Sequence, residues 1–320
     1  MQKEKNDIKY VMITCCTYKR PQKLETTIKS LFELELPADI KIEILIVDND
    51  EHCSAKPIVE KIQPISGIPI RYAVEKAPGL ANVRNKALNT SIEFGATHIA
   101  FIDDDEISDT KWILEHIEFY NSQKEIYVSS GPTYVKFDKQ YPYYIENNDV
   151  FKKPTTKKFG QIRKTCASEN VFFPLAIVKN DNLYFSEKYN FSGGEDFEFF
   201  KRVNAFGYKI GWNPKAINYE IITKERANIK WILARKYFNG FAVSQLKFDE
   251  RTFNIKKTFY IVEKFFTVIL NLVISIFSLL LGLTCFLNCC GLTAKNTGKL
   301  IGTLSPNSTN YYLERKNLNA

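Results

Sequence analysis

The chain has 320 residues, of which 45% are apolar and 25% charged, with a formal net charge of +8. This length fits one large domain or two smaller ones, and the composition excludes a wholly disordered chain. The positive charge suits nucleotide phosphates or anionic lipid, and no helix-turn-helix signature or zinc-finger spacing favours nucleic acid.

The first hundred residues alternate between strand and helix patterns. Four apolar runs of strand length occur at residues 10–16, 42–47, 68–74 and 98–102. Helical patterns lie at 21–32, where Pro21 suits a first helical position, and at 81–94. Strands that alternate with helices predict βαβ units, so we expect an α/β fold with a single, Rossmann-like, mostly parallel sheet flanked by helices.

Beyond residue 106 the pattern is less regular. Helices are expected at 112–120, 195–206 and 229–248. Short strands are expected at 126–130, 209–212 and 216–222. Residues 138–160 are rich in Lys, Tyr, Pro and Asn, which predicts a mobile loop that could meet an acceptor.

An apolar run ends in four acids at residues 99–106, which read IAFIDDDE. Carboxylates fixed at the C-terminal end of a buried strand suit a hard cation such as Mg²⁺ or Mn²⁺, with a substrate phosphate completing its ligands. Because four acids repel one another, we expect positive charge beside them. The alternative is a solvated acidic loop.

Polar residues also follow the other predicted strands. The first strand carries Thr14 and leads to Tyr18 and Arg20, and the second ends at Asp48. Parallel strands bring these groups to one edge of the sheet, where a nucleotide would bind. Asp48 could accept hydrogen bonds from a base or ribose, and Arg20 and Arg84 could offset phosphate charge. Taken singly, Asp48 has an ordinary interpretation as a turn residue.

A second acidic group, Glu195 and Asp196, follows two glycines at a predicted helix start. It is either a pair of acids that stabilises the helix dipole or a carboxylate base on a rigid turn. The sequence contains neither GxxxxGK[ST] nor GxGxxG, which argues against a P-loop NTPase and a Rossmann oxidoreductase.

The succession TYKRP, VDN, GLANVRN, FIDDDE and GGEDFEFFKR resembles family 2 glycosyltransferases of the GT-A fold, over residues 8–245. The resemblance implies inverting transfer of a sugar from a nucleotide donor, commonly UDP-linked. It implies that Asp48 contacts the nucleoside, that Asp103 and Asp105 form the D-x-D metal pair with Asp105 as the direct ligand, and that Asp196 is the general base. Asp104 and Glu195 are expected beside the donor.

A narrower likeness covers INYE at 217–220, followed by Arg226, Trp231, Arg235 and Gly240. It resembles bacterial exopolysaccharide transferases of the succinoglycan glucosyltransferase type. Many members carry a histidine where this chain has Glu220, so the roles of Glu220, Arg226 and Arg235 stay open. The three histidines of the chain have no motif support, and none is expected to be catalytic.

Residues 265–287 contain no charge and would form a helix roughly 34 Å long, enough to span a hydrocarbon core. A re-entrant hairpin or an in-plane helix would instead keep both flanks on one side, and all three alternatives stay open. The polar N-terminus lacks the apolar core of a signal peptide, and seven cysteines occur without a CxxC pair, so we expect an enzyme at the cytoplasmic face of the membrane. The expected organisation is a GT-A domain at 1–225, a basic juxtamembrane helix at 226–257, an apolar segment at 258–292 and a polar tail at 293–320.

A saccharide or lipid-linked saccharide is the expected acceptor, in cell-surface polysaccharide synthesis, because an apolar anchor would hold the site at the bilayer where such lipids lie. Two other classes remain open. A nucleotidyltransferase also uses carboxylates and Mg²⁺, but it would usually show a Gly- and Lys-rich phosphate loop. A catalytically silent nucleotide-sugar-binding protein would keep the fold without the reaction.

Overall fold

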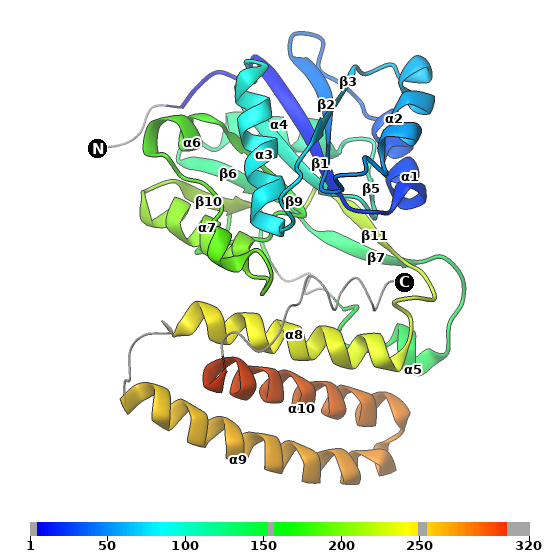
Figure 1. Ribbon diagram of the computed structural model, residues 1–320, viewed down its shortest axis with the longest axis vertical. Helices are drawn as coiled ribbons and strands as arrows, with labels where there is room; N and C mark the ends of the chain where they lie inside the picture. The colour runs from blue at the N-terminus through cyan, green and yellow to red at the C-terminus, as the bar shows by residue number, and fades with distance from the viewer. Residues whose placement is uncertain (1–4, 153–156, 249–254, 306–320) are drawn as a thin grey trace. The chain divides into compact units, whose positions relative to one another are not determined.

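The structure is a computed structural model that describes residues 5–152, 157–248 and 255–305 (Figure 1). The chain divides into two compact units. The first comprises Met1–Tyr134, Pro154–Lys188 and Glu195–Ile221. The second comprises Val135–Lys153, Tyr189–Gly194 and Ile222–Ala320.

The first unit is built on an eight-stranded mixed sheet with the order β3-β2-β1-β4-β9-β6-β10-β8. Its strands are β1 (Tyr10–Thr17), β2 (Lys41–Asp48), β3 (Ile70–Val74), β4 (His98–Asp103), β6 (Ile126–Ser130), β8 (Ile162–Arg163), β9 (Asn170–Pro174) and β10 (Lys209–Trp212). The first four strands pair in parallel, and β9 pairs antiparallel with β4 and β6. A smaller sheet has the order β5-β11-β7, from Glu106–Ser108, Asn218–Ile222 and Thr133–Phe137. The α/β fold class is confirmed.

Helices cover both faces of the large sheet. Successive side chains of each strand point to opposite faces, and here apolar side chains on both faces pack against helices. Met12 joins a core with α3 (Leu80–Glu93) and α7 (Glu195–Ala205), whereas Ile13 joins a second core with α1 (Pro21–Leu31), α2 (Lys56–Ile62) and α4 (Trp112–Ser122). Cys15 and Cys16 follow the same alternation. The sheet edge is therefore held rigidly by packing on both sides. Shorter elements are η1 (Gln63–Ile65), α6 (Ala176–Asp181) and η2 (Glu187–Tyr189).

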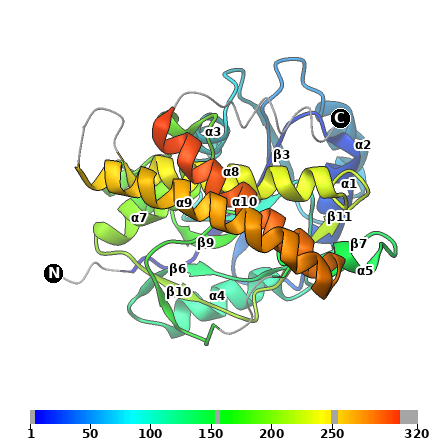
Figure 2. The same cartoon turned by 90° about the horizontal axis from the view of Figure 1, so that it is seen from below.

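The second unit contains three long helices, α8 (Ile229–Lys247), α9 (Ile255–Ser278) and α10 (Leu283–Leu304), with η3 (Leu279–Leu281) before the last. Figures 1 and 2 show α10 between α8 and α9. Residues 265–287 do not form one helix, because the chain turns at Gly282, which has φ +100°. Ile255–Leu281 is the one helical stretch among the described residues that is long and apolar enough to cross a membrane.

The segment expected as a mobile loop is instead packed where it is described. It contains α5 (Tyr143–Glu146), and Phe151 stacks on Trp231 of α8 with ring centroids 5.9 Å apart. Ile145 and Phe151 share a buried cluster with Ile232. Aromatic residues that looked like loop composition therefore form a small core of the second unit, and residues 153–156 lie outside the described part.

Candidate active site

The C-terminal ends of the parallel strands bring the predicted polar groups to one edge. In the β1–β2 register Thr17 lies opposite Asp48, and in the β1–β4 register Cys16 lies opposite Asp103. The strand packing therefore places Asp48 and the start of the acid cluster on either side of the end of β1.

A positive residue does lie beside the acid cluster, as expected. Arg20 donates from Nη1 to Asp104 Oδ1 at 3.1 Å and to Asp105 Oδ2 at 3.2 Å. Asp104 also accepts a hydrogen bond from the Thr17 hydroxyl at 2.8 Å. Asp104 and Asp105 are both buried, so this pairing offsets a repulsion that solvent would screen poorly.

Asp103 differs from its two neighbours because it ends β4 and is partly exposed. The donor set of Asp103 and Asp105 suits a hard divalent cation that takes its other ligands from water and substrate phosphates. Within the described ranges, no three Asp, Glu, His or Cys side chains gather as a ready metal site. Asp105, the expected direct ligand, faces Arg20, which makes Asp103 the more accessible of the pair.

An ion pair between Arg84 of α3 and Glu195 of α7 joins elements that lie far apart in the sequence. Only 11% of the Arg84 side chain and 4% of the Glu195 side chain are exposed. Burial acts to lower the pKa of Arg84, but Glu195, Asp103 and Asp196 together raise it above its ordinary value. Arg84 is therefore close enough to interact electrostatically with the acid cluster after β4 and with the acids at the start of α7.

Asp196 is the second residue of α7, next to Glu195, and is partly exposed. Burial of its carboxyl group and the charge of Glu195 raise the pKa of Asp196 to about 7, although Arg84 and the Phe197 N–H act in the opposite direction. That N–H donates to Asp196 Oδ1 at 2.8 Å. A carboxylate whose pKa lies near neutral pH is suited to take a proton from a hydroxyl group.

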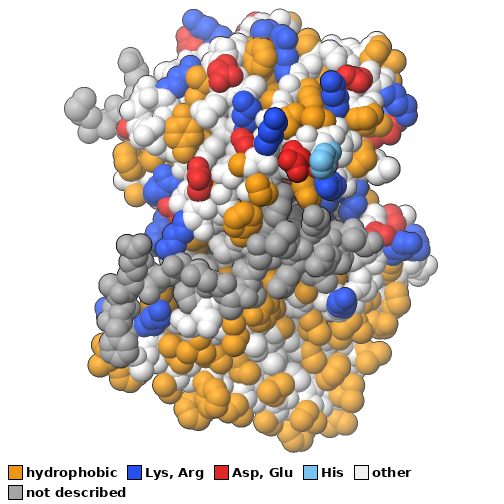
Figure 3. Space-filling model, in the orientation of Figure 1, with side chains coloured by type: hydrophobic (Ala, Val, Ile, Leu, Met, Phe, Trp, Pro, Cys, Tyr) orange, Lys and Arg blue, Asp and Glu red, His pale blue; other side chains and the backbone are white. Residues whose placement is uncertain are grey.

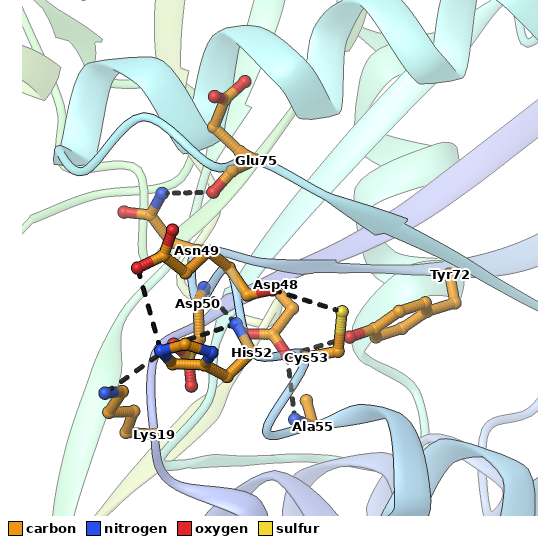
Figure 4. A network of polar contacts seen from close by, with 10 residues as sticks. Lys19, Asp48, Asn49, Asp50, His52, Cys53, Ala55, Tyr72 and Glu75 are labelled. Carbon is orange, nitrogen blue, oxygen red and sulfur yellow. Dashed lines mark hydrogen bonds and ion pairs between the residues drawn. The ribbon is translucent and has the colours of Figure 1, made fainter.

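Asp48 is fully buried and is the centre of a network that shapes the loop after β2 (Figure 4). Its Oδ2 accepts hydrogen bonds from the Ala55 N–H and the Tyr72 hydroxyl, both at 2.8 Å, and its Oδ1 accepts from the Asp50 N–H at 3.1 Å. Burial raises the pKa of Asp48 despite these donors. Both oxygens are thus engaged by its own surroundings.

Asn49 belongs to the VDN motif, but sequence reasoning gave it no role. Its Nδ2 donates to the carbonyl oxygens of Glu75 and Ala77 at 2.8 Å each, and its Oδ1 accepts from the Gly79 N–H at 3.0 Å. These bonds fix the loop between β3 and α3, where Gly79 has φ +142°. Asn49 therefore fixes the position at which α3 begins, and with it the position of Arg84 on that helix. Its sequence signals were the VDN motif and its place after a strand.

The remaining candidates lie in different settings. Thr14 is fully buried on β1, whereas Tyr18 is partly exposed at the sheet edge. Glu220 on β11 lies opposite Glu106 on β5, the last of the four acids that follow β4. Arg226 and Arg235 belong to the second unit.

Two of the three histidines are buried. Burial lowers the pKa of His98 to about 3, and that of His116 to about 4, so both are neutral at physiological pH. His116 bonds Ser129 at 2.7 Å and Asn170 at 2.8 Å. These contacts give His116 a structural role.

Sequence comparisons identify a family for the chain. The profile of Glycosyl transferase family 2 matches residues 12–180, more than half of the chain. The succinoglycan biosynthesis protein ExoM of Rhizobium meliloti is 26% identical over 242 residues, which cover 73% of this chain and 74% of ExoM. An uncharacterized glycosyltransferase of Mycoplasma genitalium, MG060, is 24% identical over 227 residues, covering 64% of this chain and 74% of MG060.

Solved structures share the fold. The mannosyltransferase PcManGT from Pyrobaculum calidifontis, in complex with GDP-Man and Mn²⁺, superposes with a TM-score of 0.65 at 13% identity and covers 93% of this chain and 88% of its own. S. aureus TarS 1-349 in complex with UDP-GlcNAc gives 0.53 at 13% identity, with coverage of 92% and 91%. The chain spans 42% of a longer TarS chain. By its sequence profile and its GT-A-like architecture, the protein belongs to glycosyl transferase family 2.

Proposed function

We propose that the protein is a metal-dependent, inverting hexosyltransferase that moves a sugar from a nucleotide-diphosphate donor, a UDP-sugar, to a hydroxyl group of a saccharide. The observation that carries this proposal is the Arg84–Glu195 pair, which connects the β4 acid cluster to the start of α7. The pair would bring the proposed site for donor phosphates and the proposed proton acceptor into one arrangement, as a group transfer requires.

The donor would lie along the edge formed by β1, β2 and β4. Tyr18 and Arg20 are partly exposed there, and Arg20 can turn its guanidinium toward phosphate oxygens. The buried groups Thr14, Asp48 and Asp104 would shape this edge, with Asp48 fixing the loop that faces the nucleoside. The nucleotide sugars in the TarS and PcManGT structures support a donor of this class.

Asp103 and Asp105 would hold Mn²⁺ or Mg²⁺, with Glu195 and Arg84 beside the donor. When bound, the cation would neutralise the diphosphate and make it a better leaving group. Before the donor arrives, Arg20 pairs with Asp105 and limits repulsion within the cluster. The Mn²⁺ in the PcManGT complex supports a divalent ion in this fold.

Asp196 would act as the general base. It takes the proton of the acceptor hydroxyl while that oxygen forms a bond to the anomeric carbon from the face opposite the diphosphate. The bond between the anomeric carbon and the phosphate oxygen breaks, and the nucleoside diphosphate leaves with the electron pair. One displacement inverts the anomeric configuration. The raised pKa of Asp196 makes it a better proton acceptor than an ordinary carboxylate.

The acceptor would be a saccharide or lipid-linked saccharide at the cytoplasmic face of the membrane, in cell-surface polysaccharide synthesis. The name of ExoM, a succinoglycan biosynthesis protein, supports this biological class. The apolar helix Ile255–Leu281 supports membrane attachment, which would raise the local concentration of a lipid-linked acceptor.

The test is a screen of nucleotide sugars with Mn²⁺, with Mg²⁺ and with a chelator, scoring the nucleotide product. We expect one donor to release its nucleoside diphosphate only when metal is present. Release of pyrophosphate would instead assign a nucleotidyltransferase. Metal-dependent donor binding without hydrolysis or transfer to any saccharide acceptor would assign a silent binding protein.

A further inference from the structure

Helix α9 places apolar side chains outward and polar side chains inward, which is the reverse of a helix in the core of a soluble protein. Its buried positions include Tyr260, Ser275 and Ser278, and the Ser275 hydroxyl lies 3.5 Å from that of Thr293 on α10. Its outward positions are large and apolar, and they are exposed. They include Phe265, Phe266, Ile269, Leu270, Leu272, Val273, Ile276 and Phe277, and they continue through Leu279–Leu281. Figure 3 shows apolar side chains gathered over this part of the second unit.

Helix α10 is tied along its length to α8. A Cβ atom on Gly240 of α8 would collide with the Lys295 carbonyl oxygen, and one on Gly298 of α10 would collide with that of Tyr237. Gln245 of α8 donates to the Gly302 carbonyl oxygen at 2.9 Å. Small residues thus allow the two helices to approach closely, so α10 cannot move away from α8 without losing this contact.

A charged pair lies near the turn that joins α9 to α10. Asp149 binds Lys236 of α8 at 2.7 Å, and the Asp149 N–H donates to the Asn288 side chain of α10. Asn288 is only six residues beyond Gly282, about 9 Å along a helix. A hydrocarbon core is about 30 Å thick. A hairpin that crossed it would carry the Lys236–Asp149 pair into lipid.

Lysines gather at the opposite end of the three helices. Lys247 of α8 and Lys264 of α9 lie 3.9 Å and 5.1 Å from the centre of the Tyr260 ring. Lys264 pairs with Glu263 at 2.6 Å. Burial and the charges of Lys264, Lys295 and Lys247 lower the pKa of Lys299. Four lysines with one glutamate leave an excess of positive charge where phosphate headgroups would be favourable.

From this arrangement we infer that α9 lies in the plane of an anionic bilayer and does not cross it. Its outer face and η3 enter one leaflet, α10 separates it from α8, and the lysine group (Lys247, Lys264, Lys295 and Lys299) meets the headgroup phosphates. Both ends of the hairpin then stay on one side of the membrane. This inference rests on the membrane attachment in the proposed function and specifies its geometry.

A bilayer suits this face better than a protein partner does. Protein interfaces have a polar rim around an apolar centre, whereas no charged residue interrupts the chain between 265 and 287. Polar residues of α9 face α10 and apolar residues face outward, which is the arrangement expected when the surroundings are as apolar as the side chains. The lysine group also matches the negative charge of a lipid surface.

Depth-dependent fluorescence quenching tests the orientation on the full chain. Phe266→Trp and Phe277→Trp place tryptophans on the outer face, eleven residues or about 16 Å apart along α9. The chain is bound to phosphatidylcholine–phosphatidylglycerol vesicles whose acyl chains carry bromine near the headgroup or near the chain end. The signal of the native chain, which has three tryptophans, is subtracted. Ile65→Trp, at an exposed apolar position of the first unit, is the matched control.

In-plane insertion predicts the same ratio of shallow to deep quenching at both positions and none at the control. Different ratios, with one position near the bilayer centre, would show a crossing helix and overturn the inference. Absence of quenching together with self-association of the chain would show that a second copy covers this face, which would also overturn it.

Two substitutions test the chemistry of the contact. Phe277→Glu should weaken binding to the vesicles about tenfold or more, because a phenylalanine that would enter the lipid is replaced by a charged side chain. Phe206→Glu, at an exposed position of the first unit, should leave binding unchanged. Lys247→Gln combined with Lys299→Gln should remove the preference for phosphatidylglycerol over pure phosphatidylcholine. An unchanged preference would contradict the role of the lysine group.

Donor hydrolysis is scored in parallel without vesicles. If the proposed transferase activity is absent, the quenching result still reports the orientation of α9. If α9 crosses the membrane, the hydrolysis result still reports the activity. The two failures are therefore distinguishable.

Discussion

Replacement of Arg84 by glutamine tests whether the ion pair with Glu195 joins the two acidic groups of the site. The substitution leaves a carboxylate with 4% of its side chain exposed, whose Oε2 has no hydrogen-bond partner within the described residues. Removing one partner of a buried pair typically costs about 3–5 kcal/mol. The total stability of a domain is about 5–15 kcal/mol, so a loss at the lower end of this range would be readily measured by urea unfolding.

The same substitution should shift the pH dependence of activity. Arg84 favours the ionised form of Asp196, so its removal raises the pKa of Asp196 further above its present value of about 7. The acidic limb of the rate profile for donor hydrolysis should therefore move to higher pH. Arg84→Gln combined with Glu195→Gln should recover most of the stability, because the unpaired charge is removed as well.

Arg202→Gln provides the control, because Arg202 forms a more exposed ion pair with Glu198 on α7. It should cost about 0–1 kcal/mol and leave the pH profile in place. If Arg84→Gln costs no more than this control and leaves the acidic limb unmoved, Arg84 does not link the two groups, and the account of the site is wrong.

Three further substitutions give measurable outcomes. Asp196→Asn should stabilise the protein at pH 8, because folding raises the pKa of this group from 3.8 to about 7 and so disfavours its charged form. The gain should be on the order of 1–3 kcal/mol after allowance for partial exposure, and urea unfolding should show it vanish below about pH 4, where the carboxyl is protonated in both states. Asp103→Asn should abolish the rise in melting temperature that Mn²⁺ with UDP gives the native chain, while leaving the melting temperature without metal equal or higher; a retained rise would exclude Asp103 as a ligand. Gly240→Ala should cost about 1–3 kcal/mol by forcing α8 from Lys295 of α10, whereas Gly67→Ala, which has open space around it, should be neutral in the same thermal unfolding measurement.

The local patterns of the sequence were sufficient for the parallel half of the sheet. β1, β2, β3 and β4 follow the hydrophobic periodicity, as do α1 and α3, and Pro21 begins α1 as expected. The helix α2 between β2 and β3 was not predicted. β9 was missed because its place depends on tertiary contacts. Asn170 at its start accepts from the Trp112 indole at 2.9 Å and donates to the carbonyl oxygens of Pro132 and Ala216. No local sequence pattern predicts these contacts of Asn170.

The candidate site was predictable to a similar degree. The strand ends placed Asp48 and Asp103 at one edge, which the strand registers confirm. The ion pair between Arg84 and Glu195 was not predictable, because it joins residues that are 111 positions apart in the sequence. Nor could the sequence separate the partly exposed Asp103, which ends β4, from the buried Asp104 and Asp105, which pair with Arg20. Burial and pairing are properties of the folded chain.

The most direct measurement compares sugar transfer by Asp196→Asn with transfer by Glu198→Gln. Both residues are acids in the first turn of α7, and only Asp196 is proposed to accept the proton of the acceptor hydroxyl. Binding of UDP with Mn²⁺ is measured for each variant by calorimetry. We predict that Asp196→Asn loses transfer and keeps nucleotide binding, whereas Glu198→Gln keeps both. Near-native transfer by Asp196→Asn would contradict the account.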